Sequence, residues 1–317
     1  MRVPPEVRAV LERADLCHVA TVTASGPHVT PMVFALAGDR LWVTTSRGSV
    51  KVRGWARDPR VAGVAAHGRE AVVFAGLATL YDVLEPSSWG RAIAETPTLA
   101  LATARFTRKN ARFFAGYAVD AHRVPLAWAP PGRVFADLRW ERVALIRDGV
   151  VARTWGRWGG SVPSRERFRA TRAGRGPLEG LPHGVHEDLG RRGTGVLAAL
   201  GRRGPVALPS AWAAVGAGLY AALPEPVLAL ADLGTPTVPA ALEIDRPSRW
   251  RARDMVGAMA RGRAEVHAID RLASGGRSAA GIAREAEVEG DRAALVRIRP
   301  EGLVWWRGWS SGTVAVG

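Results

Sequence analysis

The sequence predicts a mainly β protein with short helices, in which two similar units follow one another along the chain. Short apolar runs separated by Gly and Pro turns are typical of antiparallel strands. The same pattern returns in the second half of the chain. With 317 residues and 47% hydrophobic residues, the chain can fill two cores of ordinary size.

The first unit begins with a predicted helix. Val7, Val10, Leu11 and Ala14 have the i, i+3, i+4, i+7 spacing of an apolar helix face, which we expect to cap the first core. Strands joined by tight turns follow. Their predicted ranges are 16–24, 28–34 and a strand from Leu41 into Val43.

The next elements complete the first unit. A short helix is predicted from Lys51 to Ala56, where Asp58-Pro59 ends it. Two strands follow, at 61–65 and 71–81, then a helix-like stretch at 105–117 and a strand at 143–146. Asn110 lies inside the helix-like stretch, where it can cap or end a helix.

The end of the third strand has the composition of a phosphate-binding turn. Hydroxyl groups and turn amides donate hydrogen bonds to phosphate oxygens, Gly48 allows close approach of the backbone, and cations supply charge. The predicted phosphate ligands are Thr44, Thr45, Ser46, Ser49, Lys51 and Arg53. The alternative interpretation is a polar turn followed by the first turn of a solvated basic helix.

The strand pattern occurs twice. A shift of 178 residues aligns Gly26-Pro27 with Gly204-Pro205 and Leu41-Trp42 with Leu219-Tyr220 without a gap. We therefore predict two tandem domains at 1–160 and 191–317, joined by a Gly/Pro/Ser-rich linker at 161–190. The turn at 222–227 in the second half has no hydroxyl group, two prolines and one carboxylate, so it is not expected to bind phosphate.

The net charge of +15 does not by itself indicate a nucleic-acid-binding protein. All the cations except Lys51 and Lys109 are arginines, and they are spread along the chain. No specific nucleic-acid-binding motif is present. The basic surface is expected to attract a small anionic substrate or, without sequence preference, nucleic acid.

Neither a metal site nor a disulfide is predicted. Cys17 is the only cysteine, and His183 and His186 have a metal-ligand spacing without a third ligand in view. His28 follows Gly26-Pro27 and either faces the ligand or is an ordinary strand residue. No basic and apolar leader and no membrane-length apolar run is found, so we expect a cytoplasmic protein without a membrane partner.

The order of strands, phosphate turn and short helix resembles the pyridoxamine 5'-phosphate oxidase-like family of FMN-binding split barrels. The resemblance covers roughly residues 5–125. It rests on four segments: Ala20-Thr21-Val22, Gly26 to Pro31, Thr44 to Lys51, and Arg57 to Val61.

The resemblance implies two tandem split β-barrels that form an intramolecular pseudo-dimer, with the cofactor in the cleft between them. It implies FMN as cofactor, held at the phosphate turn and along the second strand at Thr30, Pro31, Met32 and Val33. Candidates for the opposite wall are Arg246, Trp250, Arg251 and Arg253, which could equally form a solvated basic helix with one core Trp. At most one flavin per chain is expected.

The function implied by the resemblance is that of an FMN-dependent oxidoreductase acting on an unidentified small organic substrate. Related barrels use the deazaflavin F420 or bind heme, so an F420-dependent reductase and a non-enzymatic flavin- or heme-binding module remain alternatives. No catalytic acid, base or nucleophile stands out. Flavin chemistry does not require one, because the cofactor carries the hydride or electrons. Whether the chain is an enzyme, and whether it forms larger oligomers, is left open.

Overall fold

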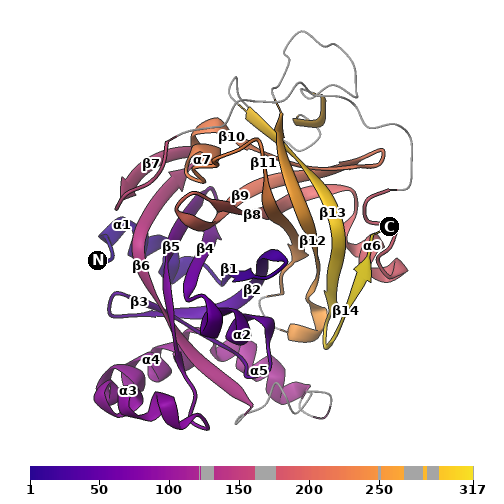
Figure 1. Cartoon of the computed structure of the whole chain (residues 1–317). Coiled ribbons are helices and arrows are strands. Elements are labelled where there is room, and N and C mark those ends of the chain that lie inside the picture. The colour runs from indigo at the N-terminus through magenta and orange to yellow at the C-terminus, as the bar shows by residue number, and fades with distance from the viewer. Residues whose placement is uncertain are drawn as a thin grey trace.

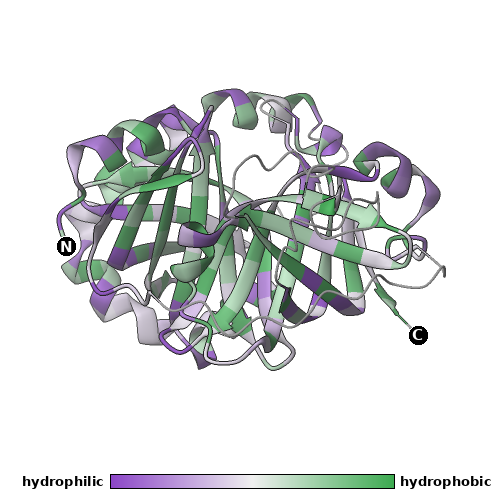
Figure 2. Ribbon diagram, turned by 90° about the horizontal axis from the view of Figure 1, so that it is seen from above, coloured by the Kyte–Doolittle hydropathy of each residue, from purple (hydrophilic) through white to green (hydrophobic). Residues whose placement is uncertain are grey.

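Two closed β-barrels lie side by side in the computed structural model (Figure 1). The structure describes residues 1–120, 122, 132–160, 176–248, 251–267, 281–283 and 293–316. Apolar residues run through the strands in the middle of the molecule (Figure 2). Among the described residues, no helix is both long and apolar enough to cross a lipid bilayer.

The first barrel is an antiparallel sheet in the order β3-β2-β1-β4-β5-β6, which closes because β3 also pairs with β6. A seventh strand, β7, extends β6 outside the barrel. The elements are α1 (Pro5–Arg13), β1 (Leu16–Thr23), β2 (Gly26–Ala37), β3 (Arg40–Ser46), α2 (Val50–Arg57), β4 (Arg60–His67), β5 (Glu70–Tyr81), β6 (Arg133–Arg147) and β7 (Val150–Trp155). The predicted strands and both predicted short helices are therefore confirmed.

A helical insertion between β5 and β6 departs from the expected single helix at 105–117. It consists of η1 (Pro86–Ser88), α3 (Trp89–Ala94), α4 (Thr96–Lys109) and α5 (Ala111–Val119). Asn110 separates α4 from α5, and its side-chain amide donates to the carbonyl oxygens of Phe106 and Phe34. Because these bonds tie the end of α4 to β2, Asn110 ends one helix instead of lying within one.

The second barrel repeats the first with the same strand order, β10-β9-β8-β11-β12-β13, closed by β10 and β13 and extended by β14. Its elements are α6 (His183–Leu189), β8 (Arg192–Gly201), β9 (Gly204–Val215), β10 (Gly218–Pro224), α7 (Glu225–Ala229), β11 (Thr237–Arg246), η4 (Ala252–Asp254), β12 (Val256–His267), β13 (Ala293–Arg307) and β14 (Ser310–Ala315). The 178-residue shift superposes the bounds of β2 and β3 on those of β9 and β10, which confirms the internal repeat.

The expected linker at 161–190 needs correction. Residues 161–175 lie outside the described residues, but 183–189 form α6, which occupies the position that α1 has in the first repeat. Leu178, Leu181, Val185 and Leu189 are buried in the core of the second barrel. The Gly and Pro content of this segment concealed a short apolar helix, so the second unit begins before residue 191.

One buried apolar cluster spans both barrels. Val29 and Ala62 of the first barrel belong to the same buried cluster as Ala198 and Leu208 of the second. Strand β2 packs on β11, β8 and β12, and its counterpart β9 packs on β4, β1 and β5. This reciprocal packing is that of a dimer with approximate two-fold symmetry inside one chain.

Gly76 is required at a β-bulge, where the register of β5 against β6 shifts. A Cβ atom on residue 76 would lie 1.9 Å from the carbonyl oxygen of Arg139, which belongs to the barrel backbone. We expect Gly76→Ala to lower the free energy of unfolding by about 3 kcal/mol, measured by urea denaturation. Gly90→Ala is the control, because no atom lies within 4 Å of its added Cβ. Equal losses in both variants would contradict this explanation.

Candidate functional site

The turn after β3 leads directly into the N-terminus of α2. Ser49 is the N-cap residue, and its hydroxyl oxygen accepts from the amide of Val52 at 3.3 Å and from Thr45 Oγ1 at 3.2 Å. The Ser49 amide itself donates to the carbonyl of Ser46 at 2.9 Å. The Ser49 hydroxyl proton is left to donate elsewhere. A capped helix N-terminus beside a row of hydroxyl groups is a local anion-binding arrangement.

The alternation of β3 separates its three hydroxyl residues. Leu41 and Val43 lie in the core of the first barrel, so Thr44 and Ser46 lie on the opposite face of the strand. Thr45 is buried, and its bond to Ser49 helps to fix the turn. Arg133 lies beside Thr44, because Arg133 Nε donates to Thr44 Oγ1 at 3.1 Å and Arg133 Nη2 donates to the Thr44 carbonyl at 2.8 Å.

Among the described residues, three cations near this turn or near His28 have no carboxylate partner. They are Lys51 on α2, Arg133 at the start of β6 and Arg261 on β12 of the second barrel. Within the part of the chain that the structure describes, none of the three forms an ion pair with Asp or Glu. Arg261 Nε is also buried without a hydrogen-bond partner. Both barrels therefore contribute uncompensated positive charge to one place.

Burial and these positive charges lower the pKa values of His28 and Lys51. Burial, then Lys51, then Arg261 lower the pKa of His28 to about 3. Burial, followed by the charge of Arg133, lowers the pKa of Lys51 to about 8. Burial also lowers the pKa of Arg133, which the nearby Tyr117 opposes. An anion bound among these groups would relieve their mutual repulsion.

Other cations of the turn are already engaged. Arg47 forms a two-pronged ion pair with Asp82, at 2.6 and 2.5 Å. Arg53 is exposed, and it donates to the carbonyl of Gly48 at 2.5 Å. Arg53 therefore braces the turn, and this bond limits its predicted role as a phosphate ligand.

The predicted wall of the second barrel is only partly described. Trp250 lies outside the described residues. Arg253 pairs with Asp120 at 3.4 Å, and the amide of Arg251 donates to the Ser248 hydroxyl at 3.0 Å. Arg246 lies at the end of β11, opposite Val256. The cation of the second barrel that lowers the pKa of His28 is instead Arg261, which the sequence did not single out.

Alternate residues of β2 lie on opposite faces of the strand. Met32 is buried in the core of the first barrel, which rules out its side chain as a cofactor contact and leaves only its backbone. Pro31 and Val33 are half-buried and lie on the other face of β2. Thr30 Oγ1 is buried without a hydrogen-bond partner, and such an atom is costly unless something binds it.

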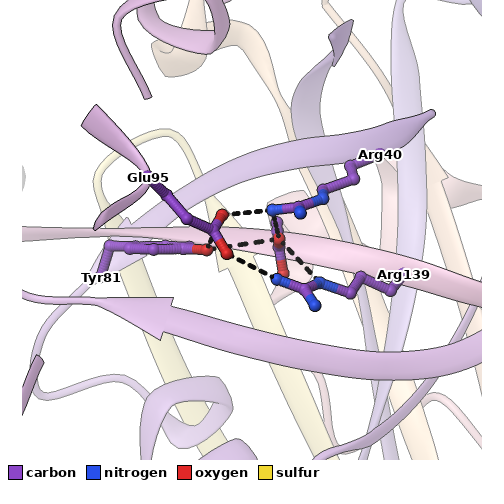
Figure 3. Close-up of polar contacts among 5 residues, drawn as sticks. Arg40, Tyr81, Glu95 and Arg139 are labelled. Atoms are coloured by element: carbon purple, nitrogen blue, oxygen red, sulfur yellow. Dashed lines mark hydrogen bonds and ion pairs between the residues drawn. The ribbon is translucent and has the colours of Figure 1, made fainter. Parts of the chain in front are cut away.

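A second polar cluster fixes the helical insertion to the sheet (Figure 3). Glu95 accepts from Tyr81 at 2.8 Å and from Arg139 at 3.0 Å, and it also pairs with Arg40. Arg40 and Arg139 both contact Asp137, at 2.8 and 3.2 Å. Since each charge in this cluster has an opposite partner, its role is structural. Only the closure of β3 against β6 brings Arg40 and Asp137 together.

A cavity of about 470 Å³ lies at the equivalent position in the second repeat. It is lined by Ala222 to Pro224 of β10 and Pro209 to Ala211 of β9, and by β4 and β5 of the first barrel. These strands correspond to those of the first cleft.

The cations of the first cleft do not recur at this cavity. Strand pairing places Ala293 where the first repeat has Arg133, and the matching bulges place Ala75 where the second repeat has Arg261. Helix α7 follows β10 directly and contains no cation.

The chain is similar to known proteins over part of its length. The family profile described as pyridoxamine 5'-phosphate oxidase matches residues 3–98, whereas the comparison with curated proteins finds no match. A pyridoxamine 5'-phosphate oxidase-related, FMN binding protein from Nostoc punctiforme is 18% identical, with a TM-score of 0.33, over 46% of this chain and 85% of its own. A conserved hypothetical protein from Mycobacterium tuberculosis is 19% identical, with a TM-score of 0.34, over 49% and 93%. An F420 reductase is 21% identical, with a TM-score of 0.30, over 45% and 98%.

The matched residues contain the whole of β1 to β5 and the turn between β3 and α2. They thus include the strands and the hydroxyl-rich turn on which the resemblance was based. The match shows that residues 3–98 are similar to the pyridoxamine 5'-phosphate oxidase family, and the second barrel repeats the strand order of the first.

Proposed function

We propose that the first cleft binds one FMN per chain and that the protein is a flavin-dependent oxidoreductase of small organic molecules. The observation that carries this proposal is the group of cations without a described carboxylate partner: Lys51 on α2, Arg133, which acts on Lys51, and Arg261, which acts with Lys51 on His28. A phosphate monoester supplies the compensating negative charge.

Different residues of the proposed site are suited to different parts of FMN. The hydroxyl groups of Thr44, Ser46 and Ser49 and the amides at the start of α2 are suited to the phosphate oxygens. The backbone of β2 from Thr30 to Val33 is suited to the edge of the ring system. When bound, the flavin supplies hydride and electron transfer.

The test is to measure the cofactor content and reactivity of the purified full-length chain. We expect the two-band spectrum of an oxidised flavin and, after denaturation, one FMN released per chain. One is expected because the second cleft has neither hydroxyl groups in its turn nor the three cations. Bleaching of the bound flavin by NADH or NADPH under anaerobic conditions is expected for an oxidoreductase.

Other outcomes separate the alternatives. Two flavins per chain would contradict the assignment to the first cleft alone. A deazaflavin spectrum would replace FMN by F420, and a Soret band would replace it by heme. Bound FMN that neither nicotinamide nucleotide nor reduced substrate bleaches would favour a non-enzymatic flavin-binding module.

A further inference from the structure

His18, Glu243 and Asp245 form a buried cluster between the two barrels. His18 lies on β1, whereas Glu243 and Asp245 lie two residues apart on β11, so their side chains share one face of the strand. His18 Nε2 is 3.4 Å from Glu243 Oε2 and 3.4 Å from each carboxylate oxygen of Asp245. One ligand atom from each residue lies within 4.8 Å of the other two.

Among the described residues, the only charged partner of Glu243 is the imidazole of His18, at 3.4 Å. The Glu243 side chain is 0% exposed, and neither carboxylate oxygen has a hydrogen-bond donor. A buried carboxylate without donors is costly unless it is protonated or bound to a cation.

The fold itself does not require these charges. Strand pairing in the other repeat places Val196 at the position of His18, Val64 at that of Glu243 and Ala66 at that of Asp245. The equivalent contact is therefore made by small apolar side chains. Because the two barrels pack through apolar side chains at this equivalent position, packing alone does not explain the charged cluster of His18, Glu243 and Asp245.

The geometry of the cluster suits a divalent transition metal. Zn²⁺ bonds to His nitrogen and carboxylate oxygen at about 2.0 to 2.2 Å, so ligand atoms at adjacent tetrahedral corners lie roughly 3.3 to 3.5 Å apart. The His18 distances of 3.4 Å to both carboxylates fall in this range. One imidazole and two carboxylates also match the charge of a divalent ion.

The cluster opens toward the cavity of the second repeat. His18 and Asp245 line this cavity of about 470 Å³, and Glu243 lies behind them, fully buried. Three protein ligands with one side facing a cavity is the arrangement of metal sites that keep a position for water or a small ligand.

We propose that His18, Glu243 and Asp245 bind a divalent transition metal ion, with Zn²⁺ as the best-matched candidate, and leave one coordination position open to the second cavity. The site is independent of the FMN assigned to the first cleft. Through this metal ion, the second cavity binds a small ligand that bears a metal-coordinating oxygen or nitrogen atom.

The proposal is tested by titrating the chelator-treated full-length protein with ZnSO₄ in a calorimeter. We expect one high-affinity Zn²⁺ per chain, with a Kd at or below about 1 μM. Glu243→Gln, Asp245→Asn and His18→Ala are each expected to weaken it at least about 100-fold. Co²⁺ in place of Zn²⁺ is expected to give the visible spectrum of a tetrahedral site, and azide is expected to shift that spectrum by occupying the open position.

A surface pair provides the matched control. His183 and Glu187 on α6 lie 3.0 Å apart, but their side chains are 84% and 63% exposed. His183→Ala should leave Zn²⁺ affinity within about twofold, because one exposed pair makes only a weak site. Absence of high-affinity Zn²⁺ binding would overturn the proposal, as would loss of binding in His183→Ala but not in Glu243→Gln. Circular dichroism and FMN content of each variant exclude misfolding as the cause of a loss.

Discussion

Replacing Lys51 by alanine is expected to weaken FMN binding by about 10- to 150-fold. A hydrogen bond to a charged group contributes roughly 1.5 to 3 kcal/mol, and Lys51 is the cation carried by the helix that begins at the phosphate turn. The loss is measured by titrating the flavin-free protein with FMN and following flavin fluorescence. Riboflavin lacks the phosphate, so its affinity should be nearly the same for both proteins. Equal losses of affinity for FMN and for riboflavin would show that Lys51 does not contact the phosphate.

The pKa of Lys51 gives this prediction a second readout. With a pKa of about 8 in the flavin-free protein, Lys51 is mostly charged at pH 7 and mostly neutral at pH 9. FMN affinity should therefore fall as pH rises through 8, by about tenfold at pH 9 relative to pH 7. Lys51→Ala should remove this dependence. A wild-type affinity that does not change between pH 7 and 9 would contradict the assignment.

Replacing Arg261 by alanine is expected to weaken FMN binding by about 10- to 100-fold, although Arg261 lies in the second barrel. Its guanidinium acts on His28 of the first barrel, and its Nε is buried without a partner. Loss of a charge-assisted contact accounts for the size of the effect. The measurement is the same fluorescence titration, with riboflavin as the ligand that should be less affected.

Arg263 offers a control on the same strand. It follows Arg261 by two residues on β12, but it is exposed to solvent. Arg263→Ala should change FMN affinity by less than about threefold, because an exposed charge is screened. If both arginines had the same small effect, the second barrel would contribute only a general positive field, and the shared cleft would be ruled out.

The turn after β3 shows how much of the candidate site local sequence can predict. Thr44, Ser46, Ser49 and Lys51 could be identified because their chemistry is concentrated within eight residues. Arg133 and Arg261 could not, since neither stands in a recognisable pattern and each reaches the turn or His28 only through strand pairing or barrel packing. The sequence also did not reveal that the Met32 side chain packs inward or that Arg53 donates to the Gly48 carbonyl, because both contacts depend on the folded backbone.

The cluster of His18, Glu243 and Asp245 is an equally non-local feature. Among the histidines of the sequence, only His183 and His186 show the short spacing of a pair of metal ligands. Residues 18 and 243 meet because β1 and β11 lie on either side of the approximate two-fold axis. No spacing rule connects two positions in different repeats until the packing of the repeats is known.

By itself, the sequence determined the strand pattern, its repetition after 178 residues and the hydroxyl-rich turn between β3 and α2, because alternation, turn residues and capping act between near neighbours. Tertiary structure decided the closure of each barrel, the assignment of α6 to the second barrel and the buried apolar cluster that spans both repeats. It also decided which charges meet. Long-range pairing and packing select those contacts, and their energies depend on burial and on partners that local sequence does not specify.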